Sequence, residues 1–105
     1  MDFQTLMNRI SSDWGVTGFH DEQSGKFIRI TVTYDHDCVW EVFDSGDVRY
    51  DEEIDSIEII GNKEPLARGH FDPADEFENE IPDPDEEERV WNKHLTEILE
   101  EARKA

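Results

Sequence analysis

The fold is decided by residues 26–43, which read KFIRITVTYDHDCVWEVF. Apolar and polar side chains alternate along this stretch, a pattern typical of antiparallel strands that have one covered face. Within 27–34 the expected covered face comprises Ile28, Ile30, Val32 and Tyr34. The polar triplet 35–37 interrupts the alternation, which resumes over 38–43. These residues therefore predict two neighbouring antiparallel strands joined by a short turn.

Shorter runs of the same kind predict three more strands. They lie at 16–22, 48–51 and 57–60, and residues rich in Gly, Ser and Asp separate them. Such residues favour the tight turns that connect antiparallel strands.

The beginning of the chain has helical periodicity. Apolar residues recur at intervals of three and four between Phe3 and Trp14, which predicts a helix over about 3–13 with Asp2 as its N-cap.

The last part of the chain predicts a longer helix. Asp83 precedes Pro84, and Glu86 follows three residues after Asp83, which is a capping box with proline at the first helical position. The expected apolar face comprises Val90, Trp91, His94, Leu95, Ile98, Leu99 and Ala102.

Residues 61–82 break the pattern, because Pro65, Gly69, Pro73 and Pro82 divide a mostly polar segment. We interpret it as a long acidic connection, and connections of this length are usually functional or mobile. The expected fold is α+β: a four- to five-stranded antiparallel β-meander flanked by an N-terminal and a C-terminal α-helix that pack on one sheet face.

The length of 105 residues suits a single small acidic domain over 1–105. A chain of this size buries roughly 65% of the surface that its unfolded form exposes, so it can fold unaided. Cys38 is the only cysteine, and no targeting or membrane-spanning segment is evident. We therefore expect a cytoplasmic protein, in the host cytosol if the gene belongs to a phage.

Charge is the dominant feature, with 28 acids, 10 bases and a formal net charge of −18. Residues 35–90 carry 21 acids and 4 bases, whereas both flanking parts are nearly neutral. Direct binding to nucleic acid or to an anionic membrane needs a basic surface and is not expected. The expected partner is a basic protein.

The acids form two groups. The turns and outward strand positions of the expected sheet carry Asp35, Asp37, Asp44, Asp47, Asp51, Glu52, Glu53 and Asp55. The connection and the start of the last helix carry Asp72, Asp75, Glu76, Glu78, Glu80, Asp83, Asp85, Glu86, Glu87 and Glu88, interleaved with Phe77 and Ile81. Alternate strand residues are about 6.8 Å apart, which is two steps of the phosphate spacing along one DNA strand. Carboxylates can thus replace phosphates, while Phe77, Ile81 or Tyr50 anchor in a partner's pocket.

Other interpretations are weaker. A passive, solvated acidic surface would carry acids throughout the chain, but the excess is confined to 35–90. No window has the ligand spacing of a calcium-binding loop, and the four histidines are scattered, so no metal or other cofactor is expected. No catalytic motif is present, and we do not expect an enzyme.

The sequence thus favours an acidic nucleic-acid mimic that inhibits a basic nucleic-acid-binding enzyme. In character it looks like the acidic decoys that bacteriophages and mobile elements use against restriction and CRISPR nucleases. Two alternatives remain open: an immunity or antitoxin protein that neutralises a basic toxin or nuclease, and an acidic adaptor for basic proteins. Homodimerisation is compatible with each of them.

Overall fold

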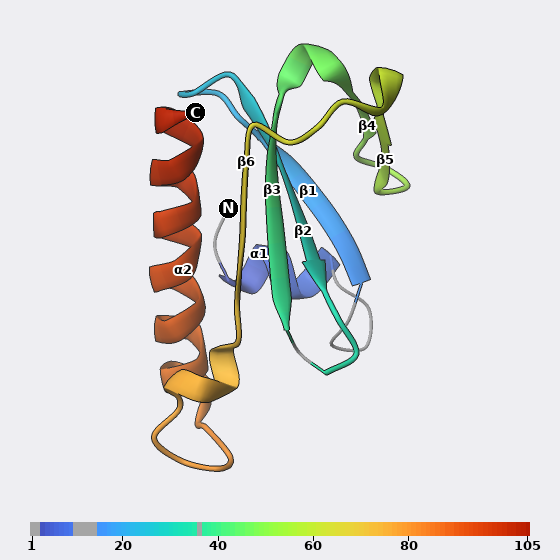
Figure 1. The fold of residues 1–105 in the computed structure, drawn as a ribbon. Coiled ribbons are helices and arrows are strands. Elements are labelled where there is room, and N and C mark those ends of the chain that lie inside the picture. Colours follow the sequence, from blue (N-terminus) through green and yellow to red (C-terminus); the bar gives the residue numbers. More distant parts are fainter. Residues whose placement is uncertain (1–2, 10–14, 36) are drawn as a thin grey trace.

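A computed structural model describes residues 3–9, 15–35 and 37–105 of the chain (Figure 1). A short helix α1 (Phe3–Arg9) is followed by three strands, β1 (Gly15–Asp21), β2 (Lys26–Val32) and β3 (Cys38–Asp44). Then come a hairpin of β4 (Val48–Asp51) and β5 (Ser56–Ile59), strand β6 (Ala67–Phe71) and the long helix α2 (Pro84–Lys104). The protein is a mixed α+β structure, as the sequence predicts.

The main sheet is antiparallel and has the strand order β1-β2-β3-β6. Ile28 lies opposite Val42, and Val32 lies opposite Cys38, so the alternation in residues 26–43 is confirmed. The prediction that Tyr34 lies on the covered face is wrong. Strand β2 ends at Val32, and the Tyr34 side chain is 81% exposed.

Strand β6 corrects the prediction for residues 61–82. This segment is not a connection throughout, because its middle part forms the fourth strand of the sheet and pairs with β3. In the sequence analysis, Gly69 counted against a regular strand. In the structure it lies opposite Trp40, where a Cβ atom would be only 2.5 Å from the indole Cζ2. The glycine leaves room for the Trp40 ring.

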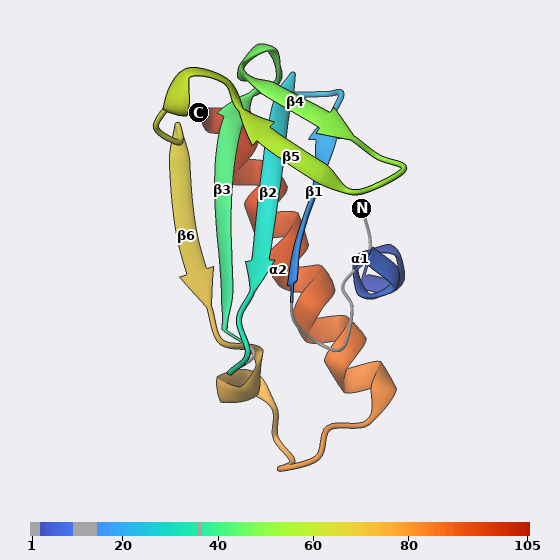
Figure 2. The same cartoon turned by 90° about the vertical axis from the view of Figure 1, so that its right-hand side faces the viewer.

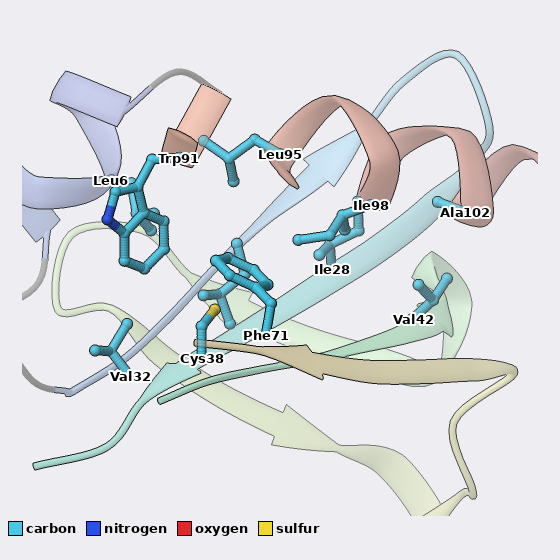
Figure 3. Packing of buried hydrophobic residues seen from close by; sticks show 11 residues of the cluster. Leu6, Ile28, Val32, Cys38, Val42, Phe71, Trp91, Leu95, Ile98 and Ala102 are labelled. Atoms are coloured by element: carbon cyan, nitrogen blue, oxygen red, sulfur yellow. The ribbon is translucent and has the colours of Figure 1, made fainter. Parts of the chain in front are cut away.

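Helix α2 packs on one face of this sheet (Figure 2). The core between them contains Ile28, Ile30, Val32, Cys38, Val42 and Phe71 from the strands, and Trp91, Leu95, Ile98 and Ala102 from the helix (Figure 3). Leu6 of α1 is fully buried in the same core. Residues 10–13 of the expected first helix, its N-cap Asp2, and Trp14 lie outside the described residues.

The prediction of a single β-meander is wrong for the hairpin β4–β5. It forms a separate two-stranded sheet that lies across the face opposite α2 (Figure 2). A second core forms there from Phe27, Phe43 and Val48, with Tyr50, Ile57 and Ile59 packed against it. Phe27 and Phe43 lie opposite each other on β2 and β3, so this face of the sheet also needs an apolar cover.

Half of the predicted capping box forms at the start of α2, because Asp83 is the N-cap but the Glu86 side chain bonds to the backbone N–H of Glu78. The Asp83 carboxylate accepts a hydrogen bond of 2.8 Å from the backbone N–H of Glu86, and Pro84 occupies the first turn. Within the described part of the chain, no helix has the length and apolar character needed to cross a bilayer.

Candidate functional site

The predicted acids gather at two ends of the structure. The hairpin β4–β5 lies at the top of both Figure 1 and Figure 2, whereas the segment between β6 and α2 lies at the bottom with the β2–β3 turn. Asp35 lines the same cleft as Pro73, so the turn acids belong with the lower group. We call Asp35, Asp37 and the acids of residues 72–88 the acidic end. We call Asp44, Asp47, Asp51, Glu52, Glu53 and Asp55 the hairpin acids.

Several hairpin acids interact with partners inside the molecule. Glu52 forms an ion pair of 3.0 Å with Arg9, and Asp44 forms one of 3.5 Å with Lys26. Asp55 accepts hydrogen bonds from the Tyr50 hydroxyl at 2.8 Å and from the Thr17 hydroxyl at 3.2 Å.

The hydrogen bond between Tyr50 and Asp55 also affects the pKa of the Tyr50 phenol. Burial, and then the hydrogen bond to Asp55, raise the pKa of Tyr50 to about 12. Tyr50 therefore supports the hairpin rather than serving as the free apolar anchor that the sequence suggested. The Asp51 carboxylate, for its part, accepts the backbone N–H of Glu53 at 3.1 Å.

Two acids on the strands, Glu41 and Glu58, form ion pairs with neighbouring arginines. Glu41 pairs with Arg29 at 2.6 Å, and Glu58 pairs with Arg49 at 3.3 Å. These two carboxylates therefore do not contribute to a row of free, phosphate-like charges along the sheet.

The acidic end is different, because most of its carboxylates have no cationic partner. Among the described residues, no Lys, Arg or His nitrogen lies within 4.0 Å of the carboxylates of Asp35, Asp37, Asp72, Asp75, Glu78, Glu80, Asp83, Asp85, Glu87 and Glu88. Arg89 lines a pocket with Glu78 and Asp85 but forms no ion pair within that distance to any carboxylate that the structure describes.

Four predicted members of the acidic end have internal contacts. Asp72 and Asp83 act as helix N-caps and accept the backbone N–H groups of Ala74 and Glu86. Glu86 is buried, and its Oε1 accepts a hydrogen bond of 2.6 Å from the backbone N–H of Glu78. Glu76 pairs with Lys93 at 2.9 Å and with the imidazole of His94. The hydrogen bond from His94, and then the one from Lys93, hold the pKa of Glu76 below its usual value.

These contacts hold the segment before α2 in place. The ring of His94 stacks on Phe71 of β6, with 3.9 Å between the ring centroids and an interplanar angle of 7°. Together with its bond to Glu76, this contact joins β6, the 3-10 helix Pro73–Glu76 and α2. His94 therefore packs between elements, as expected from its place on the apolar helix face.

An apolar cleft opens in the middle of the acidic end. Its volume is about 500 Å³, and its lining includes Phe77, Ile81 and Trp91. Asp35, Glu80 and Glu87 line it as well. The Ile81 side chain is 87% exposed, and Phe77 is half-buried. The two apolar residues that the sequence singled out as anchors thus lie beside unpaired carboxylates.

Two observations concern possible metal ligands and the cysteine. No three His, Cys, Asp or Glu side chains among them are close enough together to hold a metal ion. The Cys38 thiol is buried, and burial, followed by the charge of Asp37, raises its pKa to about 12. A thiol with this pKa is a poor nucleophile at neutral pH.

Comparisons of the chain with protein-family models, with curated proteins and with solved structures found no match.

Proposed function

We propose that this protein is an acidic inhibitor whose acidic end occupies the nucleic-acid-binding channel of a basic protein, such as a restriction or CRISPR nuclease. One observation carries the proposal: among the described residues, most carboxylates of the acidic end lack a cationic partner, whereas two of the hairpin acids, Glu52 and Asp44, are ion-paired and Asp55 is hydrogen-bonded to two hydroxyl groups. Carboxylates of this kind are available to a partner's Lys and Arg side chains.

The physical mechanism is competition for cations. A concentration of like charge attracts a basic channel over long range and speeds the encounter. Once bound, the carboxylates take the positions of phosphates. Ion pairs at the rim of such an interface are screened by salt, so inhibition should weaken as ionic strength rises.

The test compares two variants with the same change in net charge. The first replaces Asp75, Glu78, Glu80 and Glu88 with their amides. The second does the same at Glu22, Asp47, Glu53 and Glu64, which lie outside the acidic end and make no side-chain ion pair or hydrogen bond within the described structure.

Both variants are assayed against purified restriction and CRISPR nucleases, with cleavage measured over a series of duplex DNA concentrations. We expect the wild type to compete with DNA, the first variant to lose at least tenfold in potency, and the second to stay within about threefold. Equal losses would show that only the net charge matters and would refute a specific acidic end.

The apolar cleft favours a second candidate, an immunity or antitoxin protein that binds one basic toxin or nuclease. A phosphate mimic does not need exposed Ile81 beside a cleft, whereas a protein-specific inhibitor uses such an anchor. The two functions differ in one readout. An immunity protein can block cleavage while its target still binds DNA, but a mimic displaces the DNA.

A further inference from the structure

The two edge strands of the four-stranded sheet, β1 and β6, differ in the contacts that their backbone groups make. At the β1 edge, the Arg9 guanidinium donates a hydrogen bond of 2.8 Å to the backbone carbonyl of Gly18. The Thr17 hydroxyl beside it bonds to Asp55 of the hairpin. A side chain of α1 therefore caps one backbone carbonyl of this edge, and a side chain of the β4–β5 turn is bonded beside it.

Strand β6 forms the other edge and pairs only with β3. In Figure 2 it is the outermost strand of the sheet. Within the described residues, no element pairs with its outer side, and no side chain caps its backbone groups. An edge of this kind is a template for another strand, because alternate N–H and C=O groups point away from the sheet.

A groove of about 460 Å³ runs between this edge and α2. Its lining includes Trp40, Gly69, Phe71 and Ile98. Gly69 has no side chain to project into the groove, and Trp40 lies directly against it. An arriving strand would meet backbone and flat apolar surface there.

The helix side of the groove is acidic. Glu97, Glu100 and Glu101 line it from α2 and are exposed. Glu97 approaches His94 at 3.3 Å and Glu101 approaches Lys104 at 3.8 Å, whereas Glu100 has no ion pair within the described structure. A segment in this groove would therefore meet negative charge on its helix side.

We propose that β6 accepts an extended basic segment of a partner protein as a fifth strand of the sheet. Backbone hydrogen bonds along β6 supply affinity, and alternate side chains supply specificity. Side chains that face α2 are Lys or Arg, with their methylene stems over Ile98 and their charges near Glu100. Side chains on the other face lie near exposed Arg68 and His70 and are neutral or acidic.

A second copy of the chain is a poorer occupant. Antiparallel pairing of two β6 strands about a two-fold axis would place both α2 helices on the same side of the joined sheet. The acidic walls of the two grooves would then face each other, and like charges oppose the contact. Arg68 lines the strand side of the groove, but the three glutamates on its helix side leave an acidic wall that matches a basic strand.

The probe is a blocked heptapeptide, Thr-Lys-Thr-Lys-Thr-Lys-Thr. Its control has the same sequence and charge but carries N-methyl groups at alternate residues, which removes backbone donors. Binding to the full chain is measured by NMR, together with the hydrogen exchange of backbone amides. We expect the probe to slow exchange in residues 67–71 and not in residues 15–21. The N-methylated peptide should bind at least tenfold more weakly.

Variants of the protein separate this groove from the acidic end. Glu100→Lys alters an exposed side chain and should weaken the probe about tenfold. The amide variant at Asp75, Glu78, Glu80 and Glu88 should bind the probe within about threefold of wild type, whether or not it still inhibits a nuclease.

Three outcomes would overturn the proposal. Equal binding of both peptides would mean that charge alone attracts them. A loss with the acidic-end variant but not with Glu100→Lys would place the probe at the acidic end. Protection of residues 67–71 that rises with protein concentration, in the absence of peptide, would make a second copy the occupant.

Discussion

Replacing Glu86 with alanine should destabilise the protein, although Glu86 belongs to a run of acids that otherwise face solvent. Its Oε1 accepts the backbone N–H of Glu78 at 2.6 Å, and its side chain is buried. Its own N–H is held by Asp83 at 2.8 Å, a contact that alanine keeps. The substitution therefore removes one defined tie between the acidic segment and α2.

The expected loss follows from that single bond. A hydrogen bond to a charged acceptor contributes about 1.5–3 kcal/mol, and less when water can replace the acceptor. Glu78 is exposed, so its N–H can be hydrated, and we expect a loss of about 1.5 kcal/mol in the free energy of unfolding. Glu86→Gln keeps a carbonyl acceptor and should lose about 0.5 kcal/mol, because the acceptor is no longer charged.

Urea unfolding followed by tryptophan fluorescence measures these differences. Small proteins have urea m-values of about 1–3 kcal/mol per molar, so the midpoint should fall by about 1 M for the alanine variant. Glu88→Ala is the matched control, because it removes a neighbouring acid without a hydrogen bond and should stay within about 0.5 kcal/mol. If both alanine variants lose the same stability, Glu86 does not tie the segment to the helix.

Two further predictions concern titratable groups. The buried Cys38 thiol, whose pKa is raised to about 12, should not react with a disulfide reagent at pH 8 until denaturant is added; rapid reaction of the folded protein would contradict its burial. The pKa of Glu76 is lowered by His94 and then Lys93, so its stabilisation is present above its usual pKa of 4.5 and is lost as pH falls through the lowered value. The difference in Tm between wild type and Glu76→Gln should therefore shrink in acid, and a constant difference would show that the ion pairs contribute nothing.

The strands that the sequence predicted well are those with strong alternation. The inward positions of β2 and β3 hold β-branched or aromatic side chains, apart from Cys38, and both strands form where the sequence predicted them. Strand β6 reads ARGHF, and its inward positions hold Ala67, Gly69 and Phe71. Gly69 weakens the apolar alternation of β6. A glycine is needed there because the Trp40 ring of β3 occupies the space of a side chain. The contact joins residues far apart in the sequence, so the local pattern of residues does not predict it.

The place of the hairpin could not be derived from its own residues. Strands β4 and β5 are only four residues long each, and their alternation suits either an extension of the sheet or a separate cover. Phe27 and Phe43 were the available signal, because they put large apolar side chains on the face opposite Ile28 and Val42. A sheet that is apolar on both faces needs a layer on each side.

The sequence shows where the acids lie along the chain. It does not show which carboxylates form ion pairs or hydrogen bonds inside the molecule and which do not. Glu52 and Glu53 are adjacent and chemically alike, yet Glu52 meets Arg9, forty-three positions earlier, and Glu53 meets no cation among the described residues. Glu86 and Glu87 differ in the same way, since only Glu86 turns inward to the Glu78 backbone. Such differences depend on how distant segments fold together.

The remaining question is why the fold retains unpaired acids at one end. Helix geometry accounts for part of them, because Asp85 and Glu87 lie in the first turn of α2, where each gains about 0.3–1 kcal/mol from the helix dipole. Asp75, Glu78 and Glu80 lie before the helix and have no such gain, and mutual repulsion opposes their clustering. A general adaptation to salt would spread such acids over the whole surface, but residues 3–9, 15–34 and 91–105 are nearly neutral in total. The binding to a cationic partner that we propose would account for both the cluster and its position beside exposed Ile81.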